Sequence, residues 1–150
     1  MVNIRLDIKV ENKNLRQLID KYKKTAKATV GIHKKDNKKY PNADVTTAEV
    51  GYWQEFGHFT KGGNFVLPKV WLRTFHIDEQ AKKELQAYAR SRFTECETIE
   101  EAMTDVAAYI SDYIKERIRN NEVVPHSNKD GITLIDTGQL VNSIDFEVEK

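Results

Sequence analysis

The feature that most constrains the fold is a helical repeat of apolar residues between positions 99 and 118. Apolar side chains recur there at spacings of three and four, which places them along one face of a helix. They are Ile99, Ala102, Met103, Val106, Ala107, Ile110, Tyr113, Ile114 and Ile118. Thr98 and Glu101 have the spacing of a capping box at the helix start. We therefore predict one long helix that lies along the core.

Strand-like patterns occur near both ends of the chain. Apolar and polar residues alternate over residues 2–10, over 28–32 and over 144–148, and a period of two is typical of strands with one buried face. Shorter helices are expected over residues 15–22, 45–56 and 78–89, with a helical turn over 71–75. The order predicts an α+β fold, with a small mixed or antiparallel sheet packed against one long and two or three shorter helices.

Length and charge limit the classes of function. The 150 residues fit one domain, 1–150. The 24 Lys and Arg nearly balance the 23 Asp and Glu, which argues against a dedicated nucleic-acid binder. The single cysteine, Cys96, excludes an internal disulfide and a cysteine-based zinc cluster. No stretch approaches the roughly 18 apolar residues of a membrane span, so no membrane partner is expected.

Three polar segments, residues 34–44, 58–65 and 120–133, have no clear periodicity and are expected to be loops. The first contains Lys34, Lys35, Lys38 and Lys39 beside Tyr40, so a small nucleic-acid-binding protein acting through this loop is an alternative. The neutral overall charge favours a solvated loop or a protein contact. We expect the first or second loop to order against a neighbouring protein.

Patterns that carry catalysis are missing from the sequence. It contains no P-loop, no GxGxxG, no GxSxG and no HExxH. The four histidines stand far apart, and Cys96 has no recognisable base partner near it in sequence. Paired carboxylates such as Glu100-Glu101 fall at helix starts, where they favour the helix dipole. We expect no enzymatic activity, no metal and no cofactor.

Three short segments are more specific than composition explains. The first runs from Gly51 to Gly57, GYWQEFG, and suits a helix end packed on a sheet. The second is the LPKVWLR of residues 67–73, a turn with an aromatic and an arginine. The third is the LIDTGQL of residues 134–140, in which Asp136 and Gln139 have the spacing of a short capping box. A long helix separates the last two.

In this order the segments resemble the phage tail-completion or head–tail joining proteins, over about residues 28 to 148. The resemblance includes Val30-Gly31 in the strand before the first segment. It singles out these residues as an interface or structural motif: Trp53, Glu55, Phe56, Gly57, Trp71, Arg73, Asp136, Thr137, Gly138, Gln139 and Leu140.

The resemblance implies a non-enzymatic virion protein at the neck of a tailed phage, assembled in the host cytoplasm. It implies a ring, usually hexameric, that contacts the tail terminator or tail tube on one side and a head-completion or stopper protein on the other. DNA would be passing cargo only. A tail-terminator ring subunit is the nearest alternative. A ring needs two different adhesive faces, and strand edges at residues 2–10 or 143–149 are candidates.

Two local predictions follow. Glu55 stands among large apolar residues, so we expect it to pair with a positive group or with backbone amides, unless it faces solvent at a loop end. Asp136 is expected to cap a short helix, with Gln139 reaching back to it. Leu140 and Ile144 would anchor this corner to the core, either for purely internal packing or to present a fixed edge to a neighbour.

Overall fold

A computed structural model of the chain describes residues 13–41, 43–120, 122 and 138–149, with side chains described from residue 16 onward. The elements are α1 (Lys13–Lys23), β1 (Lys27–Ile32), α2 (Thr47–Phe56), β2 (His58–Phe59), β3 (Phe65–Val66), α3 (Thr74–Ile77), α4 (Glu79–Glu95), α5 (Ile99–Arg119), α6 (Gln139–Ser143) and β4 (Ile144–Glu149). The predicted α+β class is confirmed. The predicted strand over 2–10 and nearly all of the 120–133 loop lie outside the described residues.

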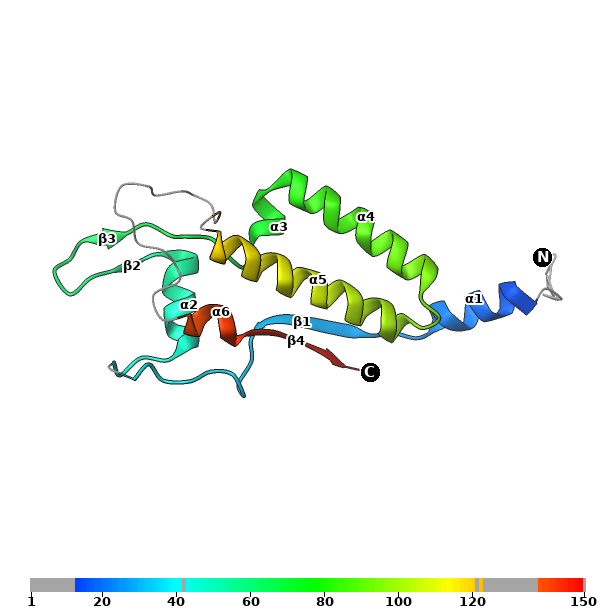
Figure 1. Cartoon of the computed structure of the whole chain (residues 1–150), viewed down its shortest axis with the longest axis horizontal. Helices are drawn as coiled ribbons and strands as arrows, with labels where there is room; N and C mark the ends of the chain where they lie inside the picture. Colours follow the sequence, from blue (N-terminus) through cyan, green and yellow to red (C-terminus); the bar gives the residue numbers. More distant parts are fainter. Residues whose placement is uncertain (1–12, 42, 121, 123–137, 150) are drawn as a thin grey trace, which may run out of the picture.

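The main sheet pairs β1, near the amino-terminal end of the described residues, with β4 at their carboxyl-terminal end. Strands β1 and β4 pair antiparallel, with Lys27 opposite Glu149 and Ile32 opposite Ile144. Helix α5 packs on this sheet, and α4 packs on the other side of α5, so α5 lies between them (Figure 1). Because α5 is covered on two sides, it needs the wide apolar face that the sequence showed.

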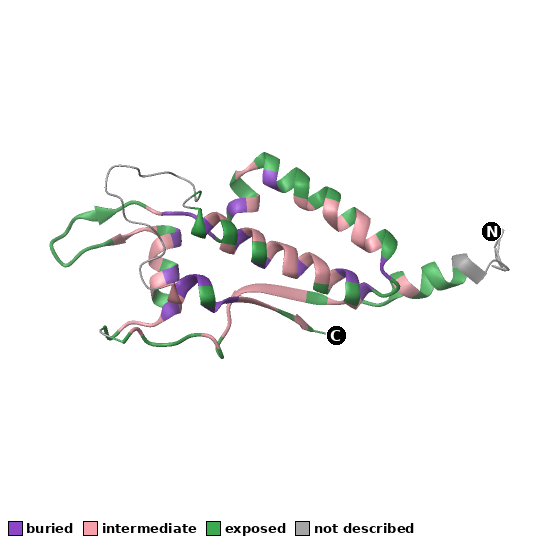
Figure 2. Ribbon diagram, viewed as in Figure 1, coloured by how far each residue is buried: buried purple, intermediate pink, exposed green. Residues whose placement is uncertain are grey.

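The core forms where α5, β4 and α6 meet. Its cluster of buried residues consists of Trp71, Ile114, Ile118, Leu140, Val141 and Ile144. Figure 2 shows buried positions along α5 and on α6. Ile114 and Ile118 are at most 1% exposed, and each such side chain stabilises the fold by roughly 1.5–3 kcal/mol. The prediction of a long core helix is confirmed.

Side chains cap the starts of helices α2, α4 and α5. Thr46 and Glu49 form a complete capping box at α2. Asp78 accepts from the amides of Gln80 and Ala81 at α4, as predicted. At α5, Thr98 accepts from the amide of Glu101 at 3.1 Å, but the Glu101 carboxylate accepts from the amide of Glu97 rather than closing the box on Thr98.

The loop predicted over residues 58–65 is confirmed at its centre, residues 60–64, but its two ends form strands. Strands β2 and β3 pair as a hairpin, with His58 opposite Val66 and Phe59 opposite Phe65. The rings of Phe59 and Phe65 lie 5.0 Å apart between centroids, and aromatic cross-strand pairs stabilise short hairpins. Gly63, at a φ of +82°, supplies the left-handed residue of the turn. The predicted helical turn over 71–75 begins later, at Thr74.

Candidate interaction site

The buried carboxylate of Glu55 joins the first two specific segments. Glu55, near the end of α2, is 2% exposed. Its Oε2 accepts from the backbone amides of Trp71 and Leu72, both at 2.8 Å. Its Oε1 accepts from the amide of Arg73 at 3.2 Å. Three successive amides just before α3 thus converge on one carboxylate.

Arg73 completes this arrangement. Its Nε donates to Oε1 of Glu55 at 2.7 Å, and its Nη2 donates to the Glu55 carbonyl at 3.3 Å. The guanidinium also lies 4.7 Å from the ring centroid of Phe56, in cation–π range. The prediction that Glu55 would pair with a positive group or with backbone amides is confirmed, and both kinds of partner are present. Because both oxygens of the Glu55 carboxylate accept hydrogen bonds, these bonds offset the free-energy cost of burying its charge.

Close packing around Gly51 ties the same unit to the core. The indole Nε1 of Trp71 donates to the Gly51 carbonyl at 2.9 Å. A Cβ at Gly51 would lie 3.0 Å from Ile32 Cδ1, 3.1 Å from Trp71 Cζ2 and 3.3 Å from Leu140 Cδ1. A glycine at this position lets helix α2 approach β1, residue 71 and α6 at once.

Gly57 is required for a different reason. It ends α2 at a φ of +76°, a conformation that favours glycine. A Cβ there would also lie 2.7 Å from both the Phe65 ring and the Val66 carbonyl oxygen. Gly57 therefore lets the β2–β3 hairpin fold back against the end of α2.

The third segment reaches the same helix from the carboxyl-terminal side. Asp136 and Thr137 lie outside the described residues, and α6 begins at Gln139 with Gly138 as its N-cap at a φ of +72°. The predicted cap at Asp136 lies outside the described residues, and a glycine in the left-handed conformation precedes the described part of the helix.

Gln139 and Leu140 make the contacts of this third segment. The amide nitrogen of Gln139 donates to the Thr47 hydroxyl at 2.8 Å and to the Lys38 carbonyl at 3.1 Å. Leu140 is 2% exposed and, with Ile144, belongs to the core cluster, as predicted. The described parts of all three segments therefore meet at α2, although they are far apart in sequence.

The outer side of this unit is strongly apolar. Six exposed residues on α2, on the hairpin and just after it define what we call the hairpin surface: Tyr52, Phe56, Phe59, Phe65, Val66 and Leu67. Phe59 is 73% exposed, Tyr52 62% and Leu67 61%. The rings of Tyr52 and Phe56 lie 4.8 Å apart between centroids in a tilted arrangement. The Phe65 ring lies close to Gly57 at the end of α2, which brings the hairpin aromatics near those of the helix. Trp53 is half-buried and packs against His58 instead.

Sequence reasoning missed this surface because residues 58–65 looked like a polar loop. The available signal was the pair of phenylalanines on either side of Gly62-Gly63, which is typical of a hairpin. Aromatic residues exposed this far in a folded domain generally mark an interaction site.

The lysine-rich loop is partly neutralised. Lys35 lies 3.1 Å from a Glu147 carboxylate oxygen and 3.5 Å from one of Asp145. Its hydrogen bond to Glu147 raises the pKa of Lys35 above the ordinary value. Lys39 pairs with Asp44 at 2.6 Å. These pairs reduce the positive charge that the loop would offer to a nucleic-acid backbone.

Among the described residues, no group of three or more His, Cys, Asp or Glu side chains could hold a metal ion. Cys96 is buried, and this burial raises the pKa of its thiol, which disfavours the reactive thiolate. The described helices include none that is both long and apolar enough to cross a membrane.

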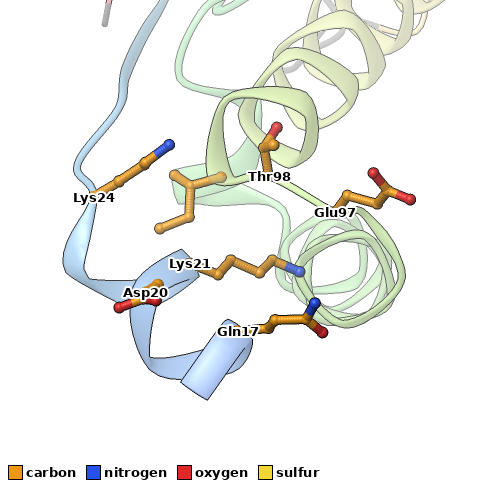
Figure 3. A pocket seen from close by; sticks show the side chains of 7 residues that line it. Gln17, Asp20, Lys21, Lys24, Glu97 and Thr98 are labelled. Atoms are coloured by element: carbon orange, nitrogen blue, oxygen red, sulfur yellow. The ribbon is translucent and has the colours of Figure 1, made fainter. Parts of the chain in front are cut away.

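A hollow of about 490 Å³ lies between α1 and the turn that joins α4 to α5 (Figure 3). Its wall mixes the cations Lys21 and Lys24 with the acids Asp20 and Glu97. The ammonium of Lys21 already donates to the carbonyls of Phe93 and Cys96. The wall thus combines opposite charges, with Lys21 directed at the turn, and it shows no grouping suited to one class of ligand.

No protein-family model matches the chain, and no curated protein or solved structure matches it either.

Proposed function

We propose that this chain is a structural virion protein of a tailed phage, a ring-forming tail-completion or head–tail connector subunit at the neck. The observation that carries the proposal is the meeting of the three family-like segments at α2. Glu55 holds residues 71–73, while Gln139 and Leu140 contact the start and the middle of the same helix. Residues that resemble a family motif thus form one structural unit.

The surface of this unit supports a binding role. The motif residues Glu55 and Arg73 are used in internal contacts, and Phe56, next to Glu55, belongs to the exposed hairpin surface. An apolar surface beside a rigid, fully hydrogen-bonded support is the arrangement expected where one protein docks on another. The proposed ring would contact the tail terminator or tail tube on one side and a head-completion or stopper protein on the other.

The experiment that tests this proposal is the mass and shape of the full-length protein in solution. Multi-angle light scattering and native mass spectrometry should find a closed oligomer, expected to be a hexamer, and negative-stain images should show rings. A monomer over the whole accessible concentration range, alone and with purified phage tails, would contradict the proposal.

Two assays separate the proposal from its alternatives. Rings that bind the end of a finished tail tube and also recruit DNA-filled heads fit a tail-completion subunit. Rings that stop tube growth and bind no head fit a tail terminator instead. Tight binding to a short DNA duplex, weakened when Lys34 and Lys38 are replaced by glutamine, would favour the nucleic-acid alternative.

A further inference from the structure

Helix α1 leaves much of its apolar side exposed, although the Tyr22 hydroxyl donates to the Phe93 carbonyl at 3.4 Å. Leu18 is 54% exposed, Ile19 37% and Tyr22 54%. Spacings of one, three and four put these three side chains on one stripe, which we call the α1 stripe. The polar Lys21 points toward the α4–α5 turn (Figure 3) and donates to the same Phe93 carbonyl at 2.8 Å. An amphipathic helix normally buries its apolar face, so this orientation needs a partner for the stripe.

The α1 stripe and the hairpin surface lie at opposite ends of the molecule. In Figure 1, α1 extends beyond one end of α5, and the β2–β3 hairpin extends beyond the other. The two surfaces also differ in form, because one is a narrow helical stripe and the other is a broad aromatic surface on a hairpin and a helix. The two surfaces are therefore different in kind, and each lies at its own end of the molecule.

We infer that the hairpin surface of one copy receives the α1 stripe of the next copy. This inference rests on the proposed function, because it names the contact through which the ring subunits join. A single head-to-tail contact of this kind covers both surfaces on every subunit. A two-fold contact between two hairpin surfaces would leave the α1 stripe exposed.

The areas fit such a contact. A large aromatic side chain presents roughly 150–250 Å² when fully exposed, so the hairpin surface and the α1 stripe together offer on the order of 1,000 Å² of apolar area. Stable protein–protein interfaces bury about 1,200–2,000 Å² in total, including a polar rim. With flanking polar residues added, the two surfaces reach the size of one standard interface.

Two aspartate substitutions test the contact. Phe59→Asp places a charge in the hairpin surface, and Leu18→Asp places one in the α1 stripe. Both positions are more than half exposed in the single chain, so the fold should persist, as circular dichroism melts would verify. Leu67→Asp serves as a second hairpin variant in case Phe59 is needed for the strand pairing. The matched control is Ile77→Asp on α3, where the side chain is 48% exposed and belongs to neither surface.

Each variant alone should weaken self-association at least about tenfold, since central apolar anchors carry most of the binding energy. The control should associate like the parent protein. The decisive measurement is an equimolar mixture of Phe59→Asp and Leu18→Asp chains. Each pair of unlike variants retains one intact contact, so the mixture should form 1:1 heterodimers that do not grow into rings.

The other outcomes are distinct. If Leu18→Asp associates like the parent protein while Phe59→Asp does not, the hairpin surface contacts itself or another element, and the inference is wrong. If rings form and neither substitution weakens them, the contact lies elsewhere although the proposed ring function stands. If the parent protein never associates, the proposed function itself fails, and the contact between copies fails with it.

Discussion

Replacing Glu55 by alanine should destabilise the protein far more than its position at a helix end suggests. The substitution removes the acceptor for the amides of Trp71, Leu72 and Arg73 and the ion-pair partner of the Arg73 guanidinium. Trp71 is 4% exposed, so its amide cannot turn to water.

The magnitude follows from these partners. Removing one member of a fully buried ion pair costs about 3–5 kcal/mol. The Arg73 side chain is 47% exposed and can be hydrated, which lowers that figure. A buried donor left without an acceptor costs about 1–3 kcal/mol, and one such amide is fully buried here while two are partly buried. We therefore expect a loss of about 2–4 kcal/mol in the free energy of unfolding, or a fall in Tm of about 5–15 °C for a chain of this length.

Urea unfolding followed by circular dichroism measures this loss, with Glu116→Ala on the exposed side of α5 as the control. The control should change the unfolding free energy by less than about 0.5 kcal/mol. Arg73→Ala should cost less than Glu55→Ala, because the carboxylate keeps its three amide donors. Glu55→Gln should recover only part of the loss, since its NH2 group would face backbone donors. If Glu55→Ala and Arg73→Ala lowered the free energy of unfolding by equally small amounts, the reasoning would be refuted. The two residues would then contribute no more than an exposed ion pair does.

Three further predictions concern packing and pH. Gly51→Ala should cost about 1–3 kcal/mol by crowding Ile32, Trp71 and Leu140, whereas Gly62→Ala, with only the Thr60 hydroxyl near at 3.9 Å, should melt within a few degrees of the parent protein. Ile114→Ala should cost about 2–5 kcal/mol in urea unfolding, since the side chain is 1% exposed; a loss no greater than that from Ile77→Ala would contradict the placement of the core. The hydrogen bond from the Ala81 amide, with Arg117, lowers the pKa of Asp78 in the folded protein below its ordinary value. The ionised carboxylate therefore stabilises the fold fully above the pKa of the unfolded chain. This contribution is lost as the pH falls through the lower pKa of the folded state. The difference in Tm between the parent protein and Asp78→Asn should therefore shrink as the pH is lowered from 6 toward 3, and a constant difference would show that the charge of Asp78 does not matter.

Several elements were predictable because short stretches of sequence dictate them. Helix α5 follows from a repeat in which nearly every third or fourth residue is apolar, and α4 begins where Asp78 can accept from free amides. Strand β1 ends near His33, as its alternation predicted. Helix α2 stops at Gly57, where the positive φ of +76° is a local preference of glycine.

Other features could not be read from local patterns. The pairing of β2 with β3 was not predicted, because Gly62-Gly63 and the polar residues around them dominate the composition. The two phenylalanines that join the strands lie on opposite sides of this turn in the sequence. The start of α6 at Gln139, after Gly138 in the left-handed conformation, is likewise known only from the structure.

The sequence by itself determined the fold class, the long core helix and the identity of Glu55 as a residue that needs partners. Only the tertiary structure decided which partners Glu55 has, that the segments around residues 55, 72 and 139 meet at one helix, and that the apolar sides of α1 and the hairpin face outward. The physical reason is the separation in sequence over which each kind of interaction acts. Periodicity and caps act between residues a few positions apart, whereas a buried carboxylate and an exposed apolar surface depend on which distant segments the chain brings together.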